Sequence, residues 1–379
     1  MEKPNRNQLM GNSKLGLVRK NRRELGMFGL LIALVIITSL GTRESGVMGL
    51  FESKFLTPDN LKNISREIGI YGIFSIGVGI VIITAGIDLS VGSLMALLGV
   101  VFLYFVTPPE TRPDSFLAKI IPEIAWPMAI IFTLVMGTLV GLMQGLLVGK
   151  LKLQAFIVTL CGLLSYRGLA RFSADDTSIN LSNSEQDLSF VRYLGEGSLA
   201  DVLKDGNGSG FLHSIPMSFV YLIGFAIFFG IVLHRSVFGR YIFAAGRNEL
   251  ATKYSGINTS IVIAFAYVIA GFCTAFAAIP FCIYTGSVQP ATHGAFFELY
   301  AIAAAVLGGC SLKGGEGSIV GILIGTAILI VLRNMVNLFG YPTPLSDAIT
   351  GGVIFIGVLL DRHGASSIVR LFTKKNKPA

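Results

Sequence analysis

Few residues of this sequence have side chains that could do chemistry, and Asp88 is the most informative of them. It is the single charged residue between positions 68 and 109. A charge in such apolar surroundings is costly and therefore calls for an explanation. Either Asp88 or Ser90 caps the helix that follows, or nearby glycines interrupt a helix that lines a substrate path. Spacing alone leaves both interpretations open, and the candidate residues here are Asp88, Ser90, Gly92 and Ser93.

A second candidate stretch, residues 298–317, combines acids with many small residues. Small residues let helices approach closely, while its glycine cluster disfavours a continuous helix. The cluster superficially resembles a phosphate-binding loop, but G-x-x-x-x-G-K-[ST] occurs nowhere in the chain. If ATP drives this protein, another chain must therefore hydrolyse it. Glu298 is the candidate residue of this stretch, and Asn334 is a further polar candidate for contacting a substrate.

The remaining polar residues do not form a catalytic or metal-binding set. The four histidines are scattered, and neither H-E-x-x-H nor G-x-S-x-G occurs. The four cysteines have no metal-ligand spacing and are expected to be small buried side chains. Arg167 and Arg171 share one helix face, and we expect them, like Arg333, to extend towards a membrane interface. The sequence therefore predicts no enzymatic activity, no metal and no cofactor on this chain.

The elements that must position these residues are membrane-spanning helices. Hydrophobic residues make up 53% of the chain, its mean hydropathy is +0.70 and only 14% of its residues are charged. A typical soluble domain has about 25% charged residues. The apolar runs do not alternate with period two, so they favour helices over the strands of a barrel. We expect an all-α, polytopic transmembrane helical bundle.

Charge predicts the topology, because positively charged loops stay in the cytoplasm. The net charge is +8, and the tails 1–25 and 361–379 are both basic. On a membrane chain, such tails do not indicate nucleic-acid binding. We expect both termini in the cytoplasm, with a permease domain over 26–360, an external acidic loop at 173–213 and a cytoplasmic loop at 235–258. About ten spans are predicted, at 26–41, 66–87, 90–107, 126–148, 154–172, 214–234, 259–284, 298–311, 317–338 and 344–360.

Four stretches of the chain form motifs, namely AGIDLSVGS at 85–93, FIVTL at 156–160 followed by Arg167-Gly168, GRYIFAAGRN at 239–248 continuing to Ile257, and ELYAIAAAVLGGCSLKGGEG at 298–317. Together they resemble the bacterial monosaccharide permeases of ribose-, galactose- and xylose-type ABC importers. They occur in the family's order and place the similarity over roughly residues 65–360. The acidic 173–213 segment is longer than in typical members.

This resemblance implies partners and a role for the cytoplasmic loop. It implies an inner-membrane importer with a second permease copy, cytosolic ATP-binding subunits that use the ATP, an external sugar-binding protein and a monosaccharide substrate. Loop 239–257 would couple to the ATPase, and we expect Gly246→Trp to uncouple transport without preventing folding. The alternative is an ion-coupled secondary sugar transporter that acts without an ATPase. The coupling candidates are Gly239, Arg240, Ala244, Gly246, Asn248 and Gly256.

Overall fold

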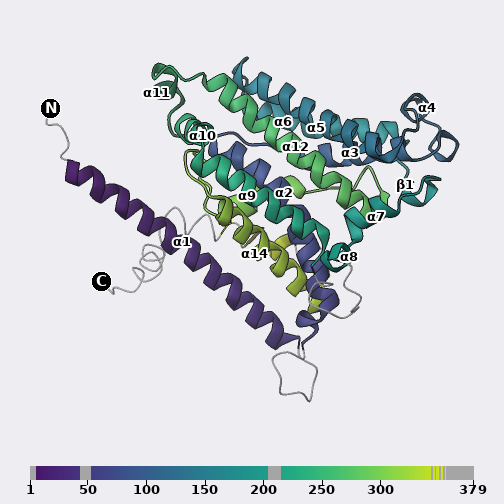
Figure 1. Cartoon of the computed structure of the whole chain (residues 1–379), viewed down its shortest axis with the longest axis horizontal. Helices are drawn as coiled ribbons and strands as arrows, with labels where there is room; N and C mark the ends of the chain where they lie inside the picture. The colour runs from purple at the N-terminus through teal and green to yellow at the C-terminus, as the bar shows by residue number, and fades with distance from the viewer. Residues whose placement is uncertain are drawn as a thin grey trace, which may run out of the picture.

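The computed structural model describes residues 6–42, 53–203 and 215–342, with scattered positions up to residue 355, and it is a bundle of helices (Figure 1). The helices are α1 (Arg6–Gly41), α2 (Pro58–Ile83), α3 (Val91–Val106), α4 (Phe116–Ile120), α5 (Trp126–Gly149), α6 (Ala155–Ser173), α7 (Ser189–Glu196), α8 (Leu199–Leu203), α9 (Met217–Arg235), α10 (Val237–Arg247), α11 (Glu249–Tyr254), α12 (Thr259–Thr285), α13 (Phe297–Leu307) and α14 (Ile319–Leu338). The 3₁₀ helices are η1 (Lys54–Leu56), η2 (Pro109–Thr111) and η3 (Leu181–Asn183), and the strands are β1 (Ile179–Asn180) and β2 (Ser287–Val288).

The expected polytopic helical membrane bundle is confirmed. Within the described residues, 7 helices are long and apolar enough to cross a membrane, namely α1, α2, α5, α6, α9, α12 and α14. Helices α3 and α13 are apolar but have only 16 and 11 residues, fewer than the roughly 20 that a full crossing needs. All of these helices coincide with predicted spans. The last predicted span, 344–360, falls almost entirely outside the described residues, so the total of ten stays a prediction.

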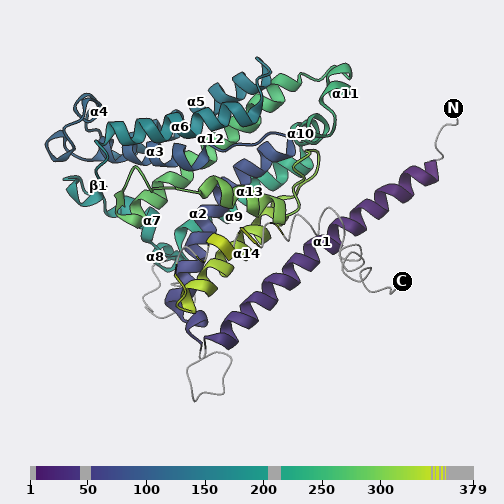
Figure 2. The ribbon, with the colours of Figure 1, turned by 180° about the vertical axis from the view of Figure 1, so that it is seen from behind.

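Helices α2 and α12 form the centre of the bundle, because both are buried over most of their length. Helices α3 and α5 pack on α12 and α6 packs on α3, whereas α9, α14 and α1 lie on the side of α2 (Figures 1 and 2). The most extensive packing joins α5 to α12. Gly137, Gly141, Gly145 and Gly149 recur every four residues, and a Cβ at any of them would come within 2.6 Å of an α12 atom. This stripe of small residues lets the two backbones touch.

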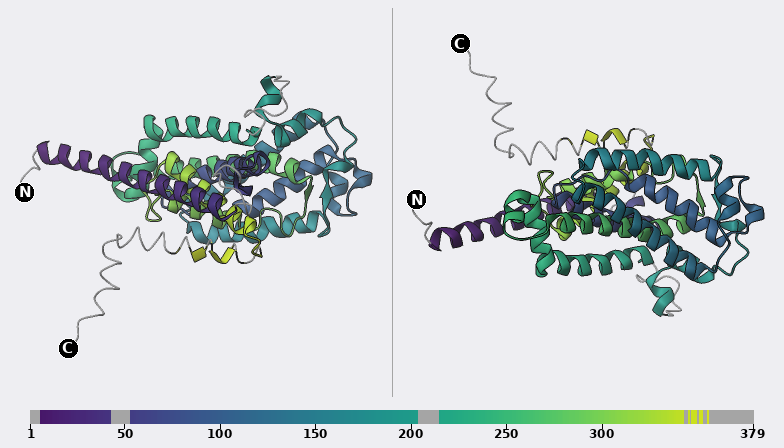
Figure 3. Two further views of the ribbon diagram at one scale, coloured as in Figure 1. Left: turned by 90° about the horizontal axis from the view of Figure 1, so that it is seen from below. Right: turned by 90° about the horizontal axis from the view of Figure 1, so that it is seen from above.

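Helix α1 continues on the N-terminal side of the predicted first span. Its candidate membrane-spanning part, Glu24–Gly41, agrees with the predicted 26–41, while the helix itself begins at Arg6. Its basic N-terminal part contains no proline and is rich in good helix formers, so charge alone does not end the helix. Figure 3 shows α1 extending past the rest of the bundle. The Ser318 hydroxyl donates a 2.7 Å hydrogen bond to Glu24, which ties α1 to the start of α14.

The acidic segment after α6 covers one end of the bundle. Strand β1 pairs antiparallel with β2, aligning Ile179 with Val288. Helix α7 packs on α12, and a Cβ at Gly195 would lie 2.6 Å from Ile283. The described part of this segment, up to residue 203, is therefore packed onto the bundle. We call this the β end, and the opposite end the α10–α11 end.

Candidate functional site

The segment around Asp88 is an interruption between two helices, deep inside the bundle. Helix α2 ends at Ile83 and α3 begins at Val91. Tyr267, which lies about two turns into α12, donates a 3.3 Å hydrogen bond from its hydroxyl to the Ile87 carbonyl. Helix α3 therefore starts well inside the bundle. The helix is therefore interrupted at Asp88, and the role of this interruption in a substrate path stays a prediction.

Asp88 is buried and organises the start of α3. Its carboxylate accepts hydrogen bonds from the Ser90 backbone N–H at 2.9 Å and from the Ser90 hydroxyl at 2.7 Å. The Gln144 amide on α5 then donates to the Ser90 hydroxyl at 2.8 Å. The Ser93 hydroxyl donates to the Ser90 carbonyl within the first turn. This chain of hydrogen bonds fixes where the short helix begins.

The start of α13 meets the start of α3, which brings the two predicted sites together. A Cβ at Gly92 would lie 2.2 Å from both the Glu298 carboxylate and the Gly294 carbonyl oxygen. Glu298 is buried, and its Oε2 has no hydrogen-bond partner in the part of the chain that the structure describes. We call Gly92, Gly294 and Glu298 the helix junction. Two short helices that begin inside a bundle, with their N-termini facing each other, resemble the discontinuous helices of transporters.

Arg167 holds the turn that leads into α13. Its Nη1 donates to the carbonyl oxygens of Pro290 at 2.8 Å and of His293 at 2.7 Å. The prediction that this side chain extends to a membrane interface is therefore wrong. It instead satisfies two backbone carbonyls of an irregular segment inside the bundle, where such groups need partners. Arg171, four residues later, forms an exposed ion pair with Asp176.

Replacing Arg167 with methionine should loosen this turn and lower stability. Hydrogen bonds to a charged group contribute about 1.5–3 kcal/mol, so Arg167→Met should cost roughly 2–3 kcal/mol while keeping the aliphatic stem. Thermal unfolding of the purified protein measures this. Arg171→Met is the matched control and should leave the unfolding midpoint nearly unchanged. An equal loss in the two variants would contradict the role given to Arg167.

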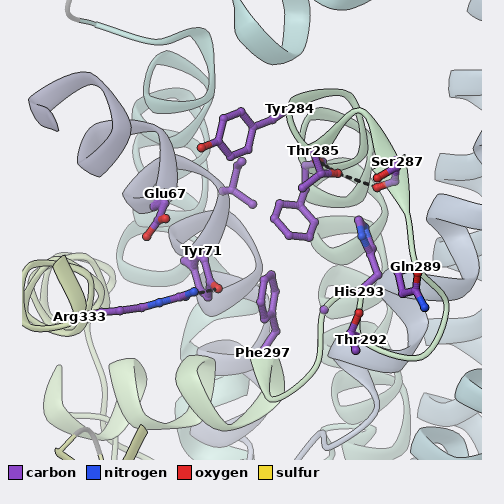
Figure 4. A pocket seen from close by; sticks show the side chains of 13 residues that line it. Glu67, Tyr71, Tyr284, Thr285, Ser287, Gln289, Thr292, His293, Phe297 and Arg333 are labelled. Atoms are coloured by element: carbon purple, nitrogen blue, oxygen red, sulfur yellow. Dashed lines mark hydrogen bonds between the residues drawn. The ribbon is translucent and has the colours of Figure 1, made fainter. Parts of the chain in front are cut away.

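A cavity of about 310 Å³ opens near the β end (Figure 4). Its lining combines aromatic rings with polar side chains from α2, α12, α13, α14 and the turn after β2. The Arg333 guanidinium donates a 2.9 Å hydrogen bond to the Tyr71 hydroxyl across the cavity wall. The lining residues are Glu67, Ile70, Tyr71, Phe281, Tyr284, Thr285, Ser287, Gln289, Thr292, His293, Gly294, Phe297 and Arg333.

None of the predicted substrate-path residues lines this cavity, although Gly92, Glu298 and Asn334 each adjoin a residue that does. Glu298 directly follows the lining residue Phe297, and Gly92 contacts the lining residue Gly294. Asn334 exchanges hydrogen bonds with Asn60 at 2.8 and 3.2 Å and so joins α14 to α2. Glu67 was not among the predicted site residues. An acidic residue inside the predicted span 66–87 is costly in a membrane, and this could have marked Glu67 as a candidate.

The loop predicted for coupling consists of two helices, α10 and α11, at the end opposite the β end. Four apolar or aromatic side chains are exposed there. Leu250 is 68% exposed and Tyr254 is 88% exposed on one face of α11, and Val237 and Tyr241 on α10 are exposed as well. In Figure 2, α11 projects beyond the adjoining helices. Large apolar side chains on such a projecting helix indicate a contact surface for another protein.

The coupling candidates shape and position these two helices. The Asn248 side chain caps α11 by accepting a 2.9 Å bond from the Ala251 N–H, and Gly256 has φ +84° in the turn that follows α11. Gly239 is buried and Ala244 partly buried, whereas Arg240 is exposed. At Gly246 a Cβ would come within 1.8 Å of the Ile83 carbonyl oxygen. The expectation that Gly246→Trp leaves folding intact is therefore wrong, because a backbone atom occupies the space.

Helix α11 is also anchored by an ion pair whose pH dependence can be tested. Glu249 accepts hydrogen bonds from Lys152 and, at 3.0 Å, from Thr259. Burial by itself raises the pKa of this carboxyl, but these bonds and the Lys152 charge leave the pKa below its usual 4.5. The anchor is therefore complete above pH 4.5 and is lost as the pH falls through the lowered pKa.

We expect amide exchange in residues 249–254, corrected for its intrinsic rate, to accelerate as the pH falls below 4.5. Glu249→Gln should show faster exchange already at neutral pH. The amides of the central helix α2 serve as the internal control. Exchange in Glu249→Gln equal to that of the unchanged protein at neutral pH would argue against the anchor.

The fold and these sites define a class: a polytopic membrane protein with interrupted helices inside and an exposed apolar surface at one end, which is the anatomy of a transport permease. The chain belongs to the family described as the permease component of the branched-chain amino acid transport system, whose model matches residues 60–358. It is a multi-pass protein of the inner membrane.

Relatives support the resemblance deduced from the four motifs. The ribose import permease protein of Haemophilus influenzae is 34% identical over 337 residues, which cover 88% of this chain and 92% of the relative. The xylose transport system permease protein of the same organism is 28% identical over 389 residues, covering 89% and 96%. An inner membrane ABC transporter permease protein of Escherichia coli is 32% identical over 307 residues, covering 79% and 82%.

The predicted membership in the monosaccharide ABC permeases is thereby confirmed, and these relatives give no support to the ion-coupled alternative. No solved structure matches the chain at a significant level.

Proposed function

We propose that this chain is the membrane-spanning permease of an ATP-driven importer that carries a monosaccharide across the inner membrane. Its relatives are described as permeases for ribose and xylose and as a component of an ABC transporter. The observation that carries the proposal is the α10–α11 surface, which exposes Leu250 and Tyr254 at one end of the bundle. A permease that worked alone would not need an apolar contact surface there.

ATP hydrolysis belongs to separate cytosolic subunits in this proposal. The chain contains no G-x-x-x-x-G-K-[ST] loop. The α10–α11 surface receives those subunits, and Gly246 passes their movement to the bundle, because it contacts the end of α2 at Ile83. Gly246 also lies against the glycine cluster after α13, since a Cβ at Gly246 would come within 2.7 Å of the Gly315 nitrogen. The Gly315 N–H in turn donates a 2.8 Å hydrogen bond to the Ile83 carbonyl at the end of α2. A displacement of α10 therefore reaches the end of α2, from which the chain continues into α3, and the glycine cluster after α13; α3 and α13 are the helices that meet at the helix junction.

The orientation follows from charge. Arg235, Arg240, Arg247 and Lys253 lie around α10 and α11, so this end faces the cytoplasm by the positive-inside rule. With ten spans, both termini are cytoplasmic. The acidic β end then faces outward, where an external sugar-binding protein delivers the substrate. A second permease copy completes the membrane part of the importer.

The decisive experiment is uptake of labelled monosaccharides into proteoliposomes that contain this chain, with and without its ATPase and binding protein. The proposal expects uptake that requires the ATPase and ATP and survives a protonophore. Uptake by this chain alone that collapses with the protonophore would overturn it. Leucine or valine uptake in place of sugar uptake would keep the ATP-driven permease and reject the substrate class.

A further inference from the structure

The cavity near the β end has the size of a site for one small ligand. Its volume of about 310 Å³ lies at the lower limit of the roughly 300–1,000 Å³ usual for ligand pockets. Six parts of one chain build it: α2, α12, β2, the turn after β2, α13 and α14. Figure 4 shows side chains from these parts pointing towards one space. The cavity is thus complete within a single chain.

The apolar part of the lining is almost entirely aromatic. Tyr71 and Phe297 lie with ring centroids 4.4 Å apart, and Phe281 is 5.1 Å from Phe297. Tyr284 adds a further ring, whereas Ile70 is the one aliphatic side chain among the lining residues. Flat ring faces suit the C–H face of a sugar ring, which is itself nearly flat. A branched aliphatic side chain would instead require a rounded aliphatic pocket.

The polar part of the lining has unused hydrogen-bonding groups. Glu67 accepts no hydrogen bond from any residue that the structure describes, and it is only partly buried. Ser178 donates to the Gln289 side-chain oxygen, which leaves the Gln289 amide nitrogen available. His293 is buried, and its Nε2 has no partner among the described residues. Glu67 and Gln289 are reached by solvent, whereas the His293 atom is buried; a buried polar atom without a partner is costly, so a ligand hydroxyl at this position would satisfy it.

The charges in the cavity select a neutral ligand. Glu67 on α2 and Arg333 on α14 attract each other, and Arg333 also bonds the Tyr71 hydroxyl. Because one negative and one positive side chain share the same wall, an anionic sugar phosphate would meet no net positive charge. A zwitterionic amino acid would have to separate this pair and place its side chain against aromatic rings.

We propose that this cavity is a binding site for one neutral monosaccharide, formed within a single permease chain. Tyr71 and Phe297 stack on the sugar ring, while Glu67, Gln289 and Arg333 bond its hydroxyls. The proposal rests on the proposed function for its substrate class. It adds that the membrane subunit itself recognises the sugar, at the turn that contacts the helix junction through Gly294.

The test is equilibrium binding of monosaccharides to the full-length chain in lipid nanodiscs, without ATPase or binding protein. Ribose, xylose, galactose, ribose 5-phosphate, leucine and valine form the panel, up to concentrations that saturate uptake by the complete importer. We expect a neutral sugar to bind. Glu67→Gln replaces a charged acceptor with a weaker neutral one and Gln289→Ala removes a hydrogen-bonding group, so each should weaken binding by about tenfold or more. Glu196→Gln, an exposed acid on α7 outside the cavity, is the matched control and should change nothing.

Three outcomes would overturn the site. The first is that the chain alone binds none of the sugars in the panel. The second is that Glu67→Gln and Gln289→Ala bind sugar as tightly as Glu196→Gln does. The third is that the chain binds leucine, valine or the sugar phosphate more tightly than the neutral sugars. Circular dichroism and thermal unfolding of each variant separate lost binding from lost folding. ATP-dependent sugar uptake by the complete importer tests the proposed function separately. Uptake with no binding by the isolated chain would refute the cavity site and leave the proposed function standing.

Discussion

Gly92→Ala is expected to abolish sugar uptake, although the substitution adds a single methyl group. The added Cβ would lie 2.2 Å from the Gly294 carbonyl oxygen and equally close to the Glu298 carboxylate. The Gly294 oxygen is backbone, so it cannot rotate away, and Gly294 itself has φ +66° in a turn held by Arg167. Either α3 or the turn before α13 must shift. Overpacking of this kind costs about 1–3 kcal/mol.

The measurement is ATP-dependent uptake per amount of permease incorporated, together with the thermal unfolding midpoint. Gly224→Ala on α9 is the matched control, because a Cβ added at Gly224 would meet no atom within 4 Å, and this variant should transport normally. Glu298→Gln separates crowding from charge, since it keeps the shape of the side chain. Uptake by Gly92→Ala within twofold of the unchanged protein would mean that transport does not depend on the close fit at the helix junction.

The positions of the spans could be predicted, because hydropathy along the chain reports directly on burial in lipid. The interruption at Asp88 was also detectable, since a lone charge and nearby glycines are local signals. What could not be predicted is the partner of that interruption. Gly92 meets Gly294 and Glu298 only after the chain has folded, and no local pattern encodes a contact between residues about 200 positions apart.

The cavity was harder to foresee for a similar reason. Tyr71, Phe281 and Phe297 are typical of apolar spans, where most aromatic residues face lipid or core. Only their convergence with Glu67 and Arg333 distinguishes them, and that convergence is tertiary. Arg167 shows the opposite error: its spacing from Arg171 indicated a shared position at an interface, yet one side chain bonds backbone carbonyls inside the bundle while the other pairs with Asp176.

At the α10–α11 surface, the sequence motif identifies the region, but Gly246 and Asn248 within it have structural roles. Gly246 and Asn248 belong to the recognisable motif, but one is buried against α2 and the other caps α11. The two most exposed apolar side chains of the surface, Leu250 and Tyr254, lie just beyond the motif's GRYIFAAGRN core. A mutation at Gly246 or Asn248 therefore alters the shape of the surface, whereas a mutation at Leu250 or Tyr254 alters contact alone.

Leu250→Ala combined with Tyr254→Ala is therefore expected to detach the ATPase while the permease folds normally. The two side chains are 68% and 88% exposed, so their removal leaves no cavity in the free permease. Large side chains at the centre of an interface commonly contribute 2 kcal/mol or more each, which corresponds to about a thirtyfold loss of affinity.

Binding of the purified ATPase to permease nanodiscs measures this loss of affinity, and uptake should fall in parallel. Tyr341→Ala, a 54% exposed tyrosine beyond the other end of α14, is the matched control. Unchanged ATPase affinity in the double variant, with normal uptake, would move the docking surface away from α11, whereas lost affinity with an unchanged unfolding midpoint would establish that these two side chains make the contact.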